Sequence, residues 1–181
     1  MLLVAGREKM NVSQSDLNKV ISNVQNVIVE AGVSATQSST DNSWHLSLGS
    51  DVSLHLLIDN NAFVLRRSDR GGDEEEFFVS TIIDAMEKFL TYTLCGSLRE
   101  DEDLPFLLVV PVPMTIEDVA RGYALLPNGD SWALVEAATG NKFYGDYVDL
   151  IEFSYYAYLS PRELREACAA PAGKPPFFPY R

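Results

Sequence analysis

The sequence contains few of the residues on which metal sites, disulfide frameworks and most active sites depend. It has two cysteines and two histidines among 181 residues. Two thiols cannot build the framework of a small secreted domain, so we expect Cys95 and Cys168 to be free, buried thiols in a reducing compartment. A zinc site needs three or four ligands, and only turn residues lie near His45 and His55 as further candidates. We therefore predict no metal, no cofactor, and two histidines that face solvent from neighbouring strands.

Signatures of catalysis are also absent. The sequence has no G-x-S-x-G nucleophile motif, no Walker lysine loop, no G-x-G-x-x-G after a strand and no H-E-x-x-H pair. Cys95 precedes Gly96 near the expected C-terminal end of a helix, where the helix dipole disfavours a thiolate. We predict that the protein is not an enzyme. A small hydrolase that assembles its carboxylates from distant positions stays open as an alternative.

Long apolar runs are missing as well. No stretch approaches the ~20 apolar residues that a membrane-spanning helix requires. The apolar run over residues 1–5 has no preceding basic region and ends at Gly6-Arg7, which is short of the roughly 7–15 residues at the centre of a secretion signal. We expect a cytoplasmic protein that does not enter a membrane.

Positive charge is scarce. Fourteen lysines and arginines stand against 26 aspartates and glutamates, so the formal net charge is −12. Such a surface repels phosphate backbones and anionic lipid at long range, and it has no basic excess with which to displace counterions. The balance argues against nucleic acid as a partner and allows fast encounter with a basic protein.

Apolar residues make up 46% of the chain, and their spacing changes along it. Steps of three and four residues predict a helix over 16–31, capped by Ser15 and stopped by Gly32. Alternation with a period of two then predicts antiparallel strands separated by turn residues. These strands cover 44–48, 52–58, 62–67 and, as a further pairing segment, 77–79.

The second half of the chain predicts more of both element types. Ser80 is the expected cap of a helix whose buried stripe extends from Ile82 to Leu98. A capping box at Ser160 followed by Pro161 predicts a short helix. The remaining expectations are a buried strand over 104–110 closed by Pro111-Val112-Pro113, a hairpin of 122–126 and 131–136 around Asn128-Gly129, either helix or strand over 149–159, and a helix over 161–169.

Together these patterns predict an α+β fold, with an antiparallel β-sheet and helices packed on it, in a single domain over 1–181. Residues 1–14 are a candidate flexible N-terminus. The Pro-rich tail over 171–181 is expected to lack regular structure, with its aromatic side chains lying across the body of the domain.

One segment carries an unusual charge pattern: Arg66-Arg67-Ser68-Asp69-Arg70-Gly71-Gly72, followed at once by four acids over 73–76. We expect three arginines to leave the end of a strand in a projecting loop that two glycines allow to turn sharply. Arginine is enriched at binding hot spots, although a merely solvated loop has a similar composition. If a second acidic cluster over 100–103 lies on the same side, the surface suits a basic or phosphate-binding cleft in another protein.

The order of these motifs is similar to that in a family of inhibitors. In order, the motifs are a tryptophan-containing strand, R-R-S-D-R-G-G, F-F-V-S at a helix start, C-G-S-L-R, and D-L-P before a strand. They resemble the motifs of the actinobacterial polymorphic-toxin immunity proteins, which include the immunity factor for the tuberculosis necrotizing toxin. The matching stretch is roughly 44–113. The resemblance implies a non-enzymatic, cofactor-free cytoplasmic inhibitor that forms a one-to-one complex with the catalytic domain of a secreted NAD-hydrolysing toxin and occludes its substrate cleft. The expected partner-binding residues are Arg66, Arg67, Ser68, Asp69, Arg70, Gly71, Gly72 and Asp73.

A different class of protein shares the element order. The expected order of elements is helix, three strands, helix, two strands and helix, and the chain is strongly acidic. This combination is similar to that of bacterial type III secretion chaperones, which are homodimers that bind an unfolded effector segment. Oligomeric state separates the two possibilities, because a toxin inhibitor can be a monomer with a folded partner.

Overall fold

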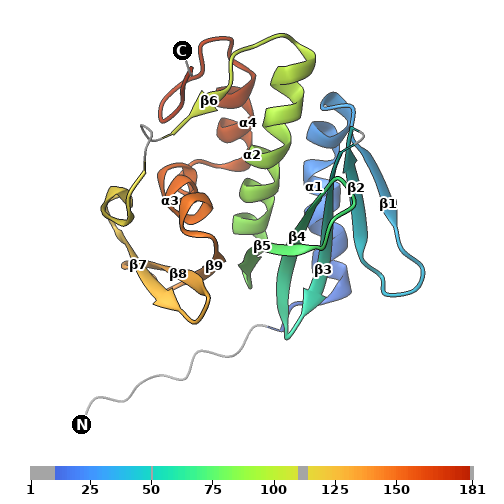
Figure 1. Cartoon of the computed structure of the whole chain (residues 1–181), viewed down its shortest axis with the longest axis horizontal. Coiled ribbons are helices and arrows are strands. Elements are labelled where there is room, and N and C mark those ends of the chain that lie inside the picture. The colour runs from blue at the N-terminus through green and yellow to red at the C-terminus, as the bar shows by residue number, and fades with distance from the viewer. Residues whose placement is uncertain (1–10, 50, 110–113, 180–181) are drawn as a thin grey trace.

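An antiparallel sheet of eight strands, in the order β1-β2-β3-β4-β5-β9-β8-β7, is the frame of the molecule. We describe it from a computed structural model over residues 11–49, 51–109 and 114–179. Helices α1 and α2 pack on the β1–β5 half, α4 packs against α2, and α3 packs on the β7–β9 half (Figure 1). The predicted α+β class, a sheet with helices packed on it, is confirmed.

The elements follow one another along the chain with short connections. In order they are α1 (Gln14–Glu30), β1 (Ser34–Gln37), β2 (Trp44–Leu48), β3 (Val52–Asp59), β4 (Ala62–Asp69), β5 (Glu75–Ser80), α2 (Ile83–Asp101), β6 (Leu107–Leu108), the 3₁₀ turn η1 (Ile116–Asp118), β7 (Tyr123–Asn128), β8 (Ser131–Glu136), β9 (Lys142–Gly145), α3 (Tyr147–Tyr156), α4 (Pro161–Ala169) and β10 (Phe178–Pro179).

The first helix begins two residues earlier than the apolar spacing predicts. Ser13, not Ser15, is its N-cap: the Ser13 hydroxyl accepts a hydrogen bond from the backbone N–H of Asp16, and the Asp16 carboxylate accepts one from the backbone N–H of Ser13. This reciprocal capping box requires an acid three residues after the cap, which Ser13 has and Ser15 does not. Gly32 follows the helix with φ of +62°, the left-handed stop that was predicted. Of the candidate flexible segment, residues 1–10 lie outside the described ranges.

The second helix also begins at a different residue from the one predicted. Ser80 is the last residue of β5, and its hydroxyl accepts a hydrogen bond from the backbone of Ile82 at 3.0 Å. Ile82 itself is the N-cap, without a side-chain hydrogen bond. The prediction that Ser80 caps this helix is therefore wrong by two residues. The strand pairs as far as Ser80, opposite Phe63, and this pairing delays the helix.

The C-terminal tail contains a short strand, although its Pro-rich composition predicts no regular structure. Only Leu107–Leu108 of the predicted 104–110 strand is a strand among the described residues, and it pairs antiparallel with Phe178–Pro179 of the tail. Residues 110–113, with the predicted proline closure, and 180–181 lie outside the described ranges. Phe177 is buried, with its ring stacked on Tyr92 at 5.6 Å. Phe177 thus closes the core, whereas the side chains of Phe178 and Tyr180 lie outside what the structure describes.

The ambiguous segment over 149–159 is helical as far as Tyr156, where α3 ends. Asp146 caps α3 by accepting a hydrogen bond from the backbone of Val148 at 2.8 Å. The helix places Phe153 among the rings of Phe78, Phe89 and Phe143, which come from β5, α2 and β9. These four rings join the two halves of the sheet in one core. No helix in the described ranges is both long and apolar enough to cross a bilayer.

Candidate functional site

The predicted arginine loop is the end of β4 followed by a tight turn. Arg66 and Arg67 lie within the strand, and the strand continues to Asp69 because β3 pairs with it that far. Arg70 and Gly71 occupy the centre of the turn with φ of +53° and +67°, and the backbone N–H of Gly72 donates to the Asp69 carbonyl at 3.0 Å. Positive φ at both central positions is typical of a type I′ turn. The expectation of a loop that leaves the strand at Arg67 and projects is therefore corrected.

The two strand arginines point to opposite faces of the sheet, as successive strand residues must. On the open face, an Arg66 guanidinium nitrogen lies 3.8 Å from the Glu74 carboxylate. On the helix face, the Arg67 guanidinium lies 5.7 Å from the ring centre of Phe77, and its Nε donates to Asp69 at 3.1 Å. Only Arg67 faces the helices.

Ser68 is a buried residue that shapes the turn. Its hydroxyl donates to the Gly72 carbonyl at 2.8 Å, and its side chain has little exposed surface. Arg70 is exposed in the turn itself. The structure thus collects Arg67, Asp69, Gly72 and Asp73 at one groove, which the other predicted site residues do not line.

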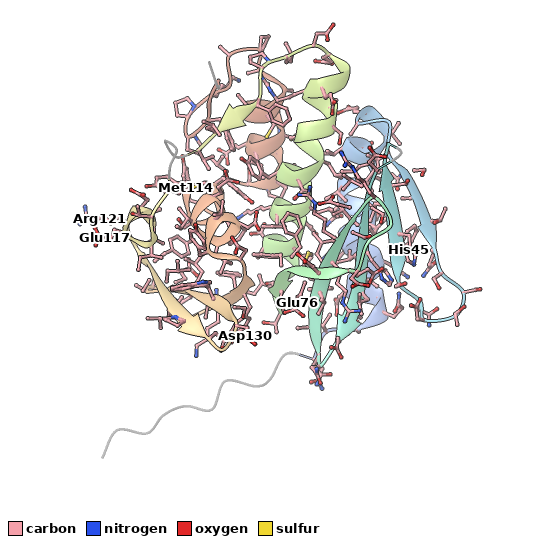
Figure 2. The ribbon with its side chains drawn as sticks, in the orientation of Figure 1. His45, Glu76, Met114, Glu117, Arg121 and Asp130 are labelled. Carbon is pink, nitrogen blue, oxygen red and sulfur yellow. The ribbon has the colours of Figure 1, made fainter. Side chains whose placement is uncertain are left out.

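This acidic groove, of about 660 Å³, contains six carboxylates and one arginine. Four of the acids come from the turn and β5, and two come from the start of α3, because β9 pairs with β5 and delivers α3 beside it. Glu76 lies between the two halves of the sheet (Figure 2). The predicted acidic cluster over 100–103 does not line the groove. The lining residues are Arg67, Asp69, Gly72, Asp73, Glu75, Glu76, Phe77, Asp146 and Asp149.

A second cavity, the aromatic pocket, shares Arg67, Phe77 and Asp149 with the acidic groove and continues inward for about 220 Å³. Residues from α2, α3, α4 and the β6 strand close it. Nothing in the local sequence indicates this pocket, because its walls come from segments as far apart as 67 and 168. The remaining lining residues are Phe89, Tyr92, Thr93, Cys95, Gly96, Arg99, Phe106, Leu107, Glu152, Tyr156 and Cys168.

At the outer end of the aromatic pocket, the acids lack compensating charge. Burial, followed by repulsion from Glu152 and Asp146, raises the pKa of Asp149 to about 7, and Arg67 opposes this rise. Burial also raises the pKa of Glu152, against a hydrogen bond from Tyr92. The hydroxyl of Tyr156 is fully buried and has no hydrogen-bond partner among the described residues. This end can therefore accept a group that brings positive charge and donors.

At the inner end, polar groups are satisfied. Arg99 is 2% exposed and donates to four backbone carbonyls, those of Pro105, Cys168, Ala170 and Pro171, at 2.6–2.9 Å. Cys95 and Cys168 are both buried free thiols, as predicted. The hydrogen bond with Cys168, together with burial, raises the pKa of the Cys95 thiol well above its usual range. A nucleophilic role for Cys95 is disfavoured, since the thiolate is the reactive form.

The two histidines do not simply face solvent. Their rings stack at 4.0 Å, and His55 is mostly buried between the Ser43 hydroxyl at 2.6 Å and the Glu74 carboxylate at 3.2 Å. This resembles a serine–histidine–acid relay, but Ser43 has no exposed surface and its hydroxyl donates to Asp41. A substrate cannot reach it, so the cluster is structural. Within the described residues, no group of three potential ligands could hold a metal ion.

Two comparisons with known proteins find a match, one to a family and one to a fold. The family model described as immunity protein 61 matches residues 27–176. A solved structure titled Rv3902c from M. tuberculosis is 19% identical, with a TM-score of 0.76 over 99% of this chain and 99% of that one. At this identity the likeness shows a shared fold. No curated protein matches the chain.

Proposed function

The chain belongs to the immunity protein 61 family, and on that premise we propose that it is a cytoplasmic antitoxin that occludes the substrate cleft of a secreted, NAD-hydrolysing toxin. Membership of an immunity family implies a non-catalytic inhibitor that binds a cognate toxin. The same membership favours this function over the secretion-chaperone alternative. The finer assignment to NAD hydrolysis rests on the resemblance of the motifs over roughly 44–113.

The observation that carries the proposal is the acidic groove beside the type I′ turn. Six carboxylates converge there, and Arg67 is the one basic residue that lines it. NAD carries a pyrophosphate, and a cleft that binds phosphates presents basic side chains and backbone N–H groups. An acidic surface with the turn of Arg70 at its edge is complementary to such a cleft. Opposite charge also accelerates encounter, which suits an inhibitor that must intercept its target.

The interface we propose includes the turn residues in distinct roles. Asp69 and Asp73 face basic groups of the toxin, Arg70 enters the mouth of the cleft, and Gly71 and Gly72 with buried Ser68 set the shape of the turn. Arg66 and Arg67 contact the toxin from the two faces of β4. The complex contains one copy of each chain.

The decisive experiment captures the partner and measures its reaction. Tagged protein is incubated with native cytosol, the eluted complex is sized by light scattering, and NAD hydrolysis by the partner is measured with and without the inhibitor. A one-to-one complex in which hydrolysis is lost supports the proposal. A homodimer that brings down an unfolded segment, or a toxin that remains active when bound, contradicts it.

A double substitution tests the site. Replacing Arg67 and Arg70 with Ala is expected to raise the dissociation constant of the complex at least tenfold, ~1.4 kcal/mol, measured by surface plasmon resonance. Arg121→Ala is the matched control, because Arg121 is exposed before β7 and lines neither cavity (Figure 2). Equal affinities for the double variant and the control would place the interface elsewhere.

A further inference from the structure

The outer end of the aromatic pocket has hydrogen-bonding capacity that no described residue fills. The Tyr156 hydroxyl is fully buried without a partner. No described residue donates a hydrogen bond to the Asp149 carboxylate, and its nearest opposing charge is Arg67. A buried polar group without a partner costs free energy, ~1–3 kcal/mol for a hydroxyl. Its persistence beside an open pocket indicates a place for a ligand.

The chemistry of the walls specifies a cation. The carboxyl groups of Asp149 and Glu152 can accept hydrogen bonds, and a cation beside them favours their ionised forms. The buried tyrosine hydroxyl provides a further acceptor. Of the lining rings, Phe77 already holds the Arg67 guanidinium at 5.7 Å from its centre, whereas Phe89 is stacked on Phe78 at 4.0 Å. The only arginine buried at the other end, Arg99, already donates to four carbonyls. At the outer end the lining carboxyl groups of Asp149 and Glu152 outnumber the Arg67 guanidinium, whose Nε is bonded to Asp69.

The molecule already holds one cation in this manner at the pocket mouth. The Arg67 guanidinium lies over the ring of Phe77 and is bonded to Asp69. A second guanidinium or ammonium group that passes the mouth would meet the carboxyl groups of Asp149 and Glu152 among the other lining residues. The mouth therefore illustrates the recognition that the interior offers.

Size and access are compatible with a long side chain. The pocket has a volume of about 220 Å³, whereas a cavity of about 150 Å³ already accepts benzene. It opens into the acidic groove through Arg67, Phe77 and Asp149. Phe106, which also lines it, is 63% exposed, an apolar surface next to the opening of the kind found at protein interfaces. A flexible chain that ends in a charge can enter with its stem against the rings and its head at the acids.

We propose that the aromatic pocket receives one arginine or lysine side chain of the toxin, bound by Asp149, Glu152 and the Tyr156 hydroxyl, while the acidic groove holds the basic residues around it. This inference rests on the proposed function, because it names the chemistry of the partner at that site. The pocket is the anchor of the complex, and the groove is its charged rim.

The first test uses the isolated protein and a small probe. The peptide acetyl-Gly-Arg-Gly-amide and its citrulline counterpart, which has the same shape without the charge, are titrated into the protein and followed by NMR. We expect the arginine peptide to bind at least tenfold more tightly than the citrulline peptide, with shifts centred on Asp149 and Tyr156. Equal binding, or shifts confined to other surfaces, would overturn the assignment.

Asp149→Asn keeps the shape of the side chain and removes its charge. It is expected to weaken binding of the arginine peptide, and of the toxin, at least tenfold, the latter through faster dissociation. Asp130→Asn is the matched control, since Asp130 is exposed at the tip of the β7–β8 hairpin (Figure 2). Glu152→Gln is a second variant, and circular dichroism verifies that each variant is folded.

The outcomes separate this inference from the proposed function. If the toxin binds and Asp149→Asn matches Asp130→Asn, the pocket assignment fails and the antitoxin function stands. If the arginine peptide binds through Asp149 but no toxin does, the proposed function fails, and the assignment of the pocket to a toxin side chain fails with it. Loss of both peptide and toxin affinity in Asp149→Asn, with the control unchanged, supports the inference.

Discussion

The two ends of the aromatic pocket hold buried polar groups in contrasting states. At the inner end, Arg99 donates to four backbone carbonyls and fastens the segment after α4 to α2. At the outer end, the Asp149 carboxylate and the Tyr156 hydroxyl receive no such support. The satisfied end stabilises the fold, whereas the unsatisfied end lowers stability and is available to a partner. Whether a buried polar residue stabilises the fold or is available to a ligand therefore depends on its hydrogen-bond partners rather than on its residue type.

The largest expected effect is on the satisfied end. Arg99→Met fills a similar volume but leaves four carbonyls without a donor, and we expect a loss of about 3–5 kcal/mol in the free energy of unfolding. Urea titration at equilibrium measures it. Arg162→Met, in which an exposed arginine paired with Glu166 is replaced, is the control and should leave the urea midpoint unchanged. A loss of less than about 1 kcal/mol for Arg99→Met would mean that the carbonyls find other donors.

A smaller effect of opposite sign is expected at the unsatisfied end. Tyr156→Phe removes a hydroxyl that is buried without a partner and keeps the ring, so it should raise the free energy of unfolding by about 1 kcal/mol. The same variant should bind the arginine peptide more weakly. Destabilisation by Tyr156→Phe would show that the hydroxyl has a hydrogen-bond partner in solution. The contrast between a satisfied and an unsatisfied end of the pocket would then be wrong.

A third expected effect is a pH dependence of stability from Asp149. The pKa of this carboxyl is about 7 in the folded protein, against an ordinary value of 3.8, so between these values the folded state binds more protons than the unfolded state. The contribution of Asp149 to stability is therefore complete below about pH 4 and decreases as the pH rises through 7.

Thermal unfolding of the wild type and of Asp149→Asn, at a series of pH values from 4 to 8, isolates this contribution. The wild type should lose stability relative to the variant as the pH rises. Binding of a cation should oppose that loss, because it favours the ionised carboxylate. A constant difference between the two proteins across the range would mean that Asp149 titrates normally.

Local sequence signals predicted the parts of the fold that depend on near neighbours. The spacing from Leu17 onward, the capping box at Ser160 and the Asn128-Gly129 turn each specify an element within a few residues, and each is present. The strands β1 and β9 were missed because they are four residues long, and β1 is also largely exposed. They form strands because they pair with neighbouring strands, β1 with β2 and β9 with β8.

The candidate site was predictable only in part, for the same reason. The acids over 73–76 are visible in the composition, but Asp146 and Asp149 join them through the pairing of Phe78 with Gly145. The side of the sheet on which Arg67 lies depends on strand register, and β5 carries an irregularity opposite Leu65 and Arg66. That irregularity turns both Phe77 and Phe78 toward the ring of Phe89. Neither outcome follows from the order of residues in the segment alone.

The hydrogen bonding of Arg99 also has a consequence for folding during synthesis. Its acceptors at Cys168, Ala170 and Pro171 follow it by about seventy residues, and Phe177 completes the ring cluster with Tyr92 later still. While these residues are still inside the ribosome, the Pro105 carbonyl is the only one of the four acceptors that is available to Arg99. A chain that ends before residue 168 therefore lacks three of the four acceptors of the buried Arg99 guanidinium.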